Sequence, residues 1–258
     1  MTNVLVVFSH GKESGPMGSK IQALMKVAER HKADVLSVDY RGNLTTTVYR
    51  HDALGEAERR VTQLLTTALP EHRQLVLVGS SMGGYVSTMA SHRLKTDALF
   101  LMAPAFYLPG YAEQDPVPKA RKTFVVHGWR DDVVPPENSV EFSKRHRCTL
   151  HLLDGDHRLN EAMPTIERLF DLFLHEITSE QLLDRARKLI LQEQNPSVAF
   201  LQRHLLINYS LALTLMQSLE GDIVTSPDAS GWRQMLQSGA RSTDDPLSQS
   251  FVADSGAN

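Results

Sequence analysis

Short apolar runs alternate with longer segments of helical spacing over the first 177 residues. Six of these runs have the length and β-branched composition of buried strands. They are Val4–Phe8, Val35–Val38, Leu75–Val78, Leu99–Met102, Thr123–Val126 and Thr149–Leu153. Amphipathic segments lie between them, including Ile21–Ala28, Ala57–Leu65 and Tyr85–Leu94, and a last one places Met163, Ile166, Phe170, Phe173 and Ile177 on one helix face. This alternation predicts an α/β fold with a mostly parallel sheet covered by helices on both faces.

The overall composition is that of an ordinary globular protein. The 258 residues carry a formal net charge of -3 at pH 7, which favours neither nucleic acid nor an anionic membrane as a partner. Cys148 is the only cysteine, so the chain can form no internal disulfide and no cysteine-based metal site. The run Val4–Phe8 is too short for a signal-peptide core, and no basic segment precedes it. We therefore expect a cytoplasmic protein that uses no metal and no organic cofactor.

A serine motif follows the third apolar run. Gly79-Ser80-Ser81-Met82-Gly83-Gly84 lies directly after Leu75–Val78 and directly before a helical pattern. A sharp turn from strand to helix exposes a serine hydroxyl above the sheet edge, and its cramped backbone requires small neighbours. Gly79 and Gly83 meet that requirement. The motif predicts that Ser81 is a nucleophile at the carboxyl edge of the sheet, where parallel sheets bind their ligands.

Two further motifs follow the fifth and sixth runs. The first, residues 127–135, reads His-Gly-Trp-Arg-Asp-Asp-Val-Val-Pro, and the second, residues 154–157, reads Asp-Gly-Asp-His. Together with the serine motif they resemble the α/β-hydrolase family, in which the order along the chain is serine, acid and histidine. The resemblance implies a triad of Ser81, Asp131 and His157. Asp132 is the competing acid, one residue later than the family pattern places it.

The first apolar run leads into the tetrapeptide Ser9-His10-Gly11-Lys12. This tetrapeptide resembles the family's His-Gly loop, and the resemblance implies that the backbone N–H of Lys12 helps to bind an oxyanion. The backbone N–H of Met82, at the start of the helix after the nucleophile, is the second expected donor. The ammonium of Lys12 is either solvated or meets an anionic group on the substrate.

The segment that commonly carries a lid in this family is short here. Only residues 103–122 separate Leu99–Met102 from the next run, so we expect an open site and a minimal version of the fold, similar to small carboxylesterases and acyl thioesterases. Three aromatic residues of this segment and one beside Asp131 are candidates for the substrate pocket, and for each of them a place in the core is the alternative. These are Phe106, Tyr107, Tyr111 and Trp129.

The pattern changes after residue 177, and we expect domains at 1–177 and 178–236. Thr178 and Gln181 have the spacing of a capping box that starts a new helix. Asn195 and Asn208 have the character of N-caps for helices over Pro196–Leu206 and Tyr209–Leu219. Two short strands of a hairpin are then predicted, Gly221–Thr225 and Gly231–Leu236. Residues 237–258 are rich in Ser, Asp and Gly and are expected to be disordered.

Residues 178–236 resemble the winged-helix gamma domain of FtsK-type DNA translocases, mainly through Leu201–Tyr209 and the helix after it. In that family, arginines at the start of the recognition helix contact DNA, whereas the corresponding positions here hold Leu211 and Thr214. Residues 178–258 carry six basic and nine acidic side chains, a balance that opposes phosphate binding. We expect a protein partner or self-association through this module rather than nucleic acid.

These features favour a serine hydrolase that cleaves a carboxylic ester or thioester through an acyl-enzyme. Two alternatives stay open. The chain could be a non-catalytic binding or regulatory protein that keeps the hydrolase scaffold and works through the winged helix. A peptidase could also use the same triad.

Overall fold

The computed structural model describes residues 4–41 and 54–236. It contains one six-stranded sheet whose paired strands are all parallel, in the order β2-β1-β3-β4-β5-β6. The strands are β1 (Val4–Ser9), β2 (Asp34–Val38), β3 (Gln74–Ser80), β4 (Ala98–Met102), β5 (Lys122–Gly128) and β6 (Thr149–Leu153). All six apolar runs of the sequence therefore form strands, and the prediction of an α/β sheet fold is confirmed.

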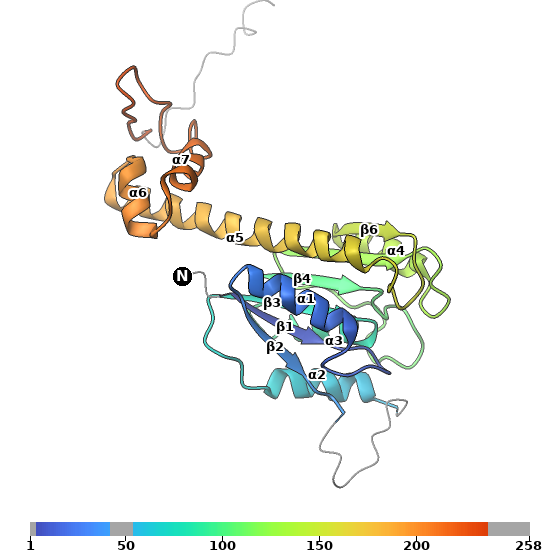
Figure 1. Ribbon diagram of the computed structural model, residues 1–258. Helices are drawn as coiled ribbons and strands as arrows, with labels where there is room; N and C mark the ends of the chain where they lie inside the picture. The colour runs from blue at the N-terminus through green and yellow to red at the C-terminus, as the bar shows by residue number, and fades with distance from the viewer. Residues whose placement is uncertain (1–3, 42–53, 237–258) are drawn as a thin grey trace, which may run out of the picture. The chain divides into compact units, whose positions relative to one another are not determined.

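Helices cover both faces of this sheet (Figure 1). Those of the first 146 residues are α1 (Ser19–Arg30), α2 (Glu56–Thr66), α3 (Met82–Ala90) and α4 (Pro136–His146). Successive side chains of a strand point to opposite faces, so in β1 Val4, Val6 and Phe8 pack with α1, while Leu5 and Val7 pack with the layer that contains α2 and α3. A strand buried on both faces must be apolar throughout, which explains the uninterrupted runs.

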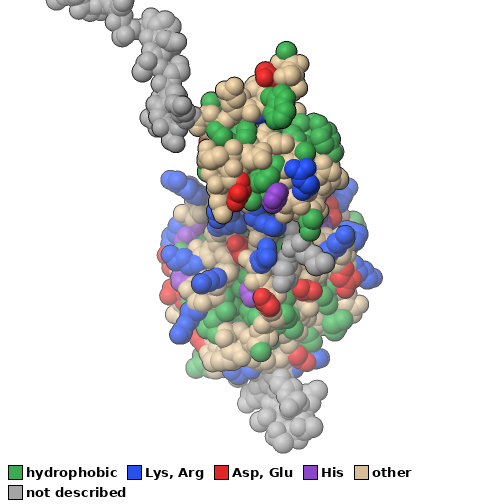
Figure 2. All heavy atoms as spheres, turned by 90° about the vertical axis from the view of Figure 1, so that its left-hand side faces the viewer, with side chains coloured by type: hydrophobic (Ala, Val, Ile, Leu, Met, Phe, Trp, Pro, Cys, Tyr) green, Lys and Arg blue, Asp and Glu red, His purple; other side chains and the backbone are tan. Residues whose placement is uncertain are grey.

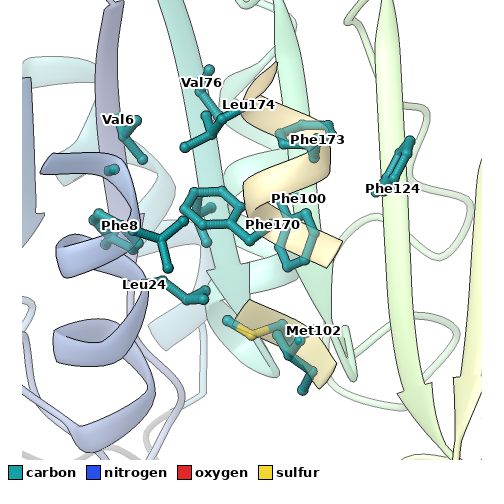
Figure 3. Packing of buried hydrophobic residues seen from close by; sticks show 14 of the residues in the cluster. Val6, Phe8, Leu24, Val76, Phe100, Met102, Phe124, Phe170, Phe173 and Leu174 are labelled. Carbon is teal, nitrogen blue, oxygen red and sulfur yellow. The ribbon is translucent and has the colours of Figure 1, made fainter. Parts of the chain in front are cut away.

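Aromatic side chains form the centre of one face. Phe100 of β4 is fully buried and lies with its ring centre 4.9 Å from that of Phe170 and 5.3 Å from that of Phe173. Phe124 of β5 joins the same group, 5.0 Å from Phe173 (Figure 3). Phe170 and Phe173 belong to α5 (Met163–Glu193). This helix therefore packs on the sheet through contacts of these two rings with Phe100 and Phe124.

Helix α5 corrects one prediction about the chain after residue 177. Thr178 does not cap a new helix: it lies inside α5, and its hydroxyl donates hydrogen bonds to the carbonyls of Leu174 and His175, at 2.9 and 3.0 Å. A threonine in a helix interior can satisfy its hydroxyl one turn back. The capping-box spacing of Thr178 and Gln181 therefore arises within one continuous helix.

The internal contacts divide the chain into two compact units, Met1–Thr178 and Ser179–Asn258. The second contains α6 (Val198–Leu205) and α7 (Tyr209–Gln217), which share a core with Ala186, Ile190 and Leu219. Asn208 caps α7 as predicted, because its side chain accepts a hydrogen bond from the backbone N–H of Leu211 at 2.8 Å. The cap of α6 is Ser197 rather than Asn195, so that helix starts two residues later than the sequence predicts.

The predicted hairpin is present only in a reduced form. Val224 and Met235 form a single antiparallel bridge, and the N–H of Thr225 donates to the carbonyl of Gln234 at 2.9 Å. Between them the Asp228 carboxylate accepts hydrogen bonds from the backbone N–H groups of Ser230 and Trp232 and so holds the connecting turn. These residues form a short wing. The predicted disordered tail, residues 237–258, lies outside the described residues.

In the part of the chain that the structure describes, no helix combines the length and the apolar content needed to cross a bilayer.

We expect Phe100→Ala to destabilise the protein strongly, because it removes a ring on which three other rings pack. Truncation of a buried phenylalanine costs roughly 3 to 5 kcal/mol of unfolding free energy. Leu172→Ala is the matched control, since Leu172 lies on the same helix as Phe170 and Phe173 but is 47% exposed. Urea unfolding followed by circular dichroism measures both variants. A loss at Phe100 no larger than that at Leu172 would contradict this account of the core.

Candidate active site

Ser81 lies between β3 and α3 in a conformation that few residues adopt. Its φ and ψ angles are 54° and -121°, and such a left-handed backbone is strained for a residue with a β-carbon. Hydrogen bonds fix the turn on both sides: the N–H of Ser81 donates to the carbonyl of Met102 at 2.9 Å, and its carbonyl accepts from Gly84 at 2.9 Å. The strained turn is the sharp elbow that the serine motif predicts.

Two glycines allow this turn to pack against its neighbours. A β-carbon at Gly79 would lie 2.2 Å from the carbonyl oxygen of Gly83, and one at Gly83 would lie 2.0 Å from the carbonyl oxygen of Ser9. Both distances are far shorter than any van der Waals contact. The glycines are therefore required by the close approach of α3 to β3 and to the end of β1.

The three predicted triad residues meet at the carboxyl edge of the sheet. Nε2 of His157 lies 3.0 Å from Oγ of Ser81, and Nδ1 of His157 lies 2.8 Å from Oδ2 of Asp131. Because a carboxylate only accepts hydrogen bonds, Nδ1 carries the proton in the neutral ring and Nε2 is free to accept the proton of the serine hydroxyl. The side chain of Asp131 is fully buried, while that of His157 is 19% exposed.

Asp131 accepts more hydrogen bonds than the one from His157. Its second oxygen accepts from the backbone N–H groups of Val133 and Val134 at 2.9 and 2.8 Å. Burial by itself would raise the pKa of Asp131, but the hydrogen bonds from His127, His157 and the two backbone groups outweigh it and hold that pKa well below its usual range. The carboxylate therefore stays ionised although it is buried.

His127 is the residue that the sequence analysis left without a role. Its Nε2 lies 2.9 Å from Oδ2 of Asp131 and 3.0 Å from the carbonyl oxygen of Val134, and its Nδ1 lies 2.6 Å from Oγ of Ser139. The ring is fully buried, so these contacts orient Asp131 from behind. The sequence feature that could have indicated this role is the position of His127 at the start of the motif over residues 127–135, four residues before Asp131.

Arg60 of α2 holds the loop that follows β1. Its guanidinium is fully buried and donates to the carbonyls of His10 and Gly11 at 3.2 Å and of Lys12 at 3.3 Å. Its Nε donates to Glu56 at 2.7 Å. Burial opposes ionisation of Glu56, but the hydrogen bonds from Arg59 and Arg60 prevail and lower the pKa of Glu56. The sequence carries no signal for this arrangement, because Arg59 and Arg60 both read as surface cations on an amphipathic helix.

His10 stiffens the same loop. It is fully buried, with Nδ1 2.8 Å from the carbonyl oxygen of Gly11 and Nε2 accepting the backbone N–H of Tyr40 at 3.3 Å. Burial lowers the pKa of His10 to about 4, so the ring is neutral at neutral pH. A β-carbon at Gly11 would lie 3.5 Å from Cβ of Ser81. The loop therefore passes directly beside Ser81.

The two predicted oxyanion donors both lie on the pocket around Ser81. Lys12 and Met82 line this pocket, and neither backbone N–H has an acceptor among the described residues. Unpaired N–H groups beside a nucleophile are suited to bind a developing negative charge. The arrangement can therefore support attack by a serine hydroxyl on a carbonyl carbon.

The pocket has a volume of about 990 Å³ and is lined by Ser81, His157 and residues of several loops. Tyr111 lines it, as one of the predicted aromatic candidates. Phe106, Tyr107 and Trp129 do not. Phe106 is buried in the core, and its ring is stacked on that of Phe142 with 4.2 Å between the ring centres. Tyr107 packs beside Phe106. Trp129 is 57% exposed. The pocket walls are instead supplied by Ile21, Leu54, Ala57, Leu108, Pro109 and Val133.

No group of three or more His, Cys, Asp or Glu side chains is placed to hold a metal ion within residues 4–41 and 54–236.

Solved structures with a similar fold cover about two thirds of this chain. A member of the alpha/beta hydrolase superfamily from Xanthomonas campestris pv. campestris is 30% identical, with a TM-score of 0.56, and the match covers 67% of this chain and 99% of the relative. Est1E from Butyrivibrio proteoclasticus, in a structure with bound ferulic acid, is 20% identical with a TM-score of 0.56 and covers 67% of this chain and 89% of its own. An alpha/beta serine hydrolase without a lid from Xanthomonas campestris is 20% identical with a TM-score of 0.54, over 67% and 81%.

Two family models match different parts of the sequence. The model of the uncharacterised protein family UPF0227 matches residues 5–114, and that of the Ftsk gamma domain matches residues 178–238. A comparison with curated proteins gives no significant match. The second match agrees with the resemblance of α6, α7 and the short wing to a winged helix. The serine elbow, the parallel sheet and the relative that is matched over almost its entire length show that this chain belongs to the α/β-hydrolase superfamily.

Proposed function

We propose that the protein is a serine hydrolase that cleaves carboxylic esters or thioesters through an acyl-enzyme. The observation that carries this proposal is the continuous hydrogen-bonded series from Ser81 through His157 to Asp131, with contacts of 3.0 and 2.8 Å. A nucleophile, a base and a residue that orients the base are the parts that such catalysis needs. They come from three separate loops, after β3, β5 and β6, and their convergence at one point supports a shared chemical role.

In the proposed reaction, Oγ of Ser81 attacks the carbonyl carbon while Nε2 of His157 takes its proton. Asp131 stabilises the imidazolium that forms, and its pKa, held low by four hydrogen bonds, keeps it negative. The backbone N–H groups of Lys12 and Met82 bind the oxyanion. His157 then protonates the leaving alcohol or thiol, and water releases the acid from Ser81 by the same steps in reverse order.

The open pocket supports an acyl ester or thioester more than a folded protein substrate. Its apolar walls, which include Leu108, Pro109 and Tyr111, suit a small acyl or alkyl group. Est1E, which shares the fold, has been seen with bound ferulic acid, and a carboxylic acid is the class of product that ester hydrolysis releases. A peptidase on this triad would have to protonate a more basic leaving group.

For the second unit we propose contact with protein rather than DNA. Large apolar side chains are exposed at the end of α6, at the start of α7 and on the wing: Leu206 is 86% exposed, Tyr209 57% and Trp232 71%. Figure 2 shows hydrophobic side chains on the face that this unit turns to the viewer. Exposed aromatic and aliphatic residues are typical of protein interfaces, whereas DNA contact needs basic side chains at such positions.

We expect Ser81→Ala to lower kcat/KM for short para-nitrophenyl esters by roughly a thousandfold or more, because the nucleophile is lost. Ser87→Ala is the control: Ser87 lies on α3, is fully buried, and its hydroxyl has no hydrogen-bond partner among the described residues. A fluorophosphonate probe should label wild type and Ser87→Ala but not Ser81→Ala. If the wild type is neither labelled nor active, the non-catalytic scaffold is the better account.

Asp131→Asn should lower kcat by about 10³- to 10⁴-fold, since an amide no longer holds His157 in the correct tautomer. Asp132→Asn is the matched control, because Asp132 is the adjacent acid and is exposed. A larger loss at Asp132 would transfer the role of the acid to it.

The difference in stability between wild type and Asp131→Asn should depend on pH. Because the folded-state pKa of Asp131 is lowered, its ionised carboxylate stabilises the fold fully above the unfolded-state pKa of about 3.9. This contribution begins to shrink as pH falls below that value and is lost as pH falls through the folded-state pKa. Urea unfolding should therefore show wild type more stable than Asp131→Asn at pH 7, with a difference that narrows below about pH 4. A difference that is constant over this range would show that Asp131 carries no stabilising charge.

We expect no saturable binding of duplex DNA by the full chain at concentrations up to about 100 μM and physiological salt, since non-specific DNA binders have dissociation constants of roughly 1 to 100 μM under these conditions. Fluorescence anisotropy of a labelled duplex measures this. Binding at lower concentrations that weakens with added salt would contradict the proposed protein-contact role of the second unit.

A further inference from the structure

Lys20 is a charged residue of the catalytic pocket that the proposed mechanism does not use. It is the second residue of α1, and the residues around it, Gly18, Ser19 and Ile21, line the same pocket as Ser81 and His157. Its side chain is only partly exposed. It makes no hydrogen bond and no ion pair with any described residue. A lysine ammonium that is poorly solvated and has no partner lowers the stability of the folded protein. A function in the pocket beside Ser81 would explain why the lysine lies there.

The acids near Lys20 are already engaged elsewhere. Asp131 accepts hydrogen bonds from two histidines and two backbone N–H groups, and Asp156 accepts one from the N–H of Leu159 at 2.9 Å. Neither carboxylate comes within ion-pair distance of the ammonium. Burial lowers the pKa of Lys20 to about 8, against the opposing attraction of Asp156 and Asp131. The ammonium therefore remains the main form at pH 7.

The other charges of the pocket differ from Lys20 in exposure or pairing. Glu13, Asp132, Asp156 and Arg158 are exposed, so water and salt screen them. Glu56 is paired with Arg59 and Arg60. Lys12, like Lys20, is partly exposed, and its ammonium has no partner among the described residues. The poorly solvated and unpaired charges of this pocket are therefore positive.

We propose that Lys20 binds an anionic group of the substrate, so that the preferred ester or thioester carries a carboxylate or a phosphate. This proposal rests on the hydrolase function proposed above and names the substrate class of the same site. A charged partner at Lys20 would replace the water that the ammonium has lost, and such charge-assisted hydrogen bonds are about twice as strong as neutral ones. Lys12, on the same pocket, adds to the positive potential that an anionic substrate meets.

Two matched substrate pairs test the proposal with the full chain. Mono-para-nitrophenyl adipate and para-nitrophenyl hexanoate have equal acyl length and differ by a carboxylate. S-butyryl-4′-phosphopantetheine and S-butyrylpantetheine share the thioester and the pantetheine arm and differ by one phosphate on the leaving group. We expect wild type to prefer the charged member of at least one pair, and that pair tells carboxylate from phosphate. Because the contact is between charges, the preference should shrink as NaCl is raised.

Lys20→Met should lose about tenfold or more in kcat/KM on the preferred charged substrate beyond any loss on its neutral partner, mainly through KM. Lys26→Met is the control, because Lys26 is an exposed lysine on the same helix, and it should keep the wild-type preference. Circular dichroism melting of both variants verifies that they are folded.

The outcomes separate this proposal from the proposed function. Turnover of the esters without preference for charge, or equal losses of Lys20→Met on both members of a pair, overturns the role of Lys20 and leaves the hydrolase intact. Failure of wild type to cleave any of the four substrates, together with failure of a fluorophosphonate to label Ser81, overturns the hydrolase and the Lys20 proposal with it.

Discussion

The close approach of backbone at two glycines is the constraint on which the rest of the site depends. A side chain at Gly83 would overlap the carbonyl of Ser9, and one at Gly79 would overlap Gly83 itself. Their absence lets α3 start directly against the ends of β3 and β1. The strained backbone of Ser81, the N–H of Met82 and the loop with Lys12 consequently surround one small volume, where charge can develop next to fixed donors.

Two buried polar networks hold the loops around that volume. Behind the acid, His127 and Ser139 support Asp131, and its remaining acceptor capacity is filled by backbone N–H groups. Behind the loop that follows β1, Arg60 joins three consecutive carbonyls to Glu56. Buried charges are tolerated only when their hydrogen bonds are satisfied, and satisfied networks rigidify their surroundings. Lys20 is the contrast, since it lines the same pocket and its ammonium has no such partner among the residues that the structure describes.

The predictions that were wrong rest on local sequence patterns that occur in more than one structural environment. Phe106 in the short segment after β4 and Trp129 beside Asp131 are both aromatic pocket candidates. Phe106 is nevertheless packed in the core against Phe142, whereas Trp129 is mostly in solvent. Thr178 has the spacing of a capping box, but the apolar face of α5 continues through it, and its hydroxyl bonds backward. In each case the surroundings of the side chain are formed by segments distant in the chain, so the neighbouring sequence does not reveal them.

The sequence by itself determined the six strands of the sheet and the elbow at Ser81, and it singled out Asp131 and His157 as the proposed partners of Ser81. Strand periodicity, glycine spacing and motif order are local properties, so they are legible without coordinates. Only the tertiary structure decided that Ser81 and His157, 76 positions apart in the chain, lie 3.0 Å from one another. It also decided that Arg60 is buried, that Lys20 lines the pocket and that Phe106 does not. Burial and pairing depend on which distant elements pack together, and no residue type carries that information alone.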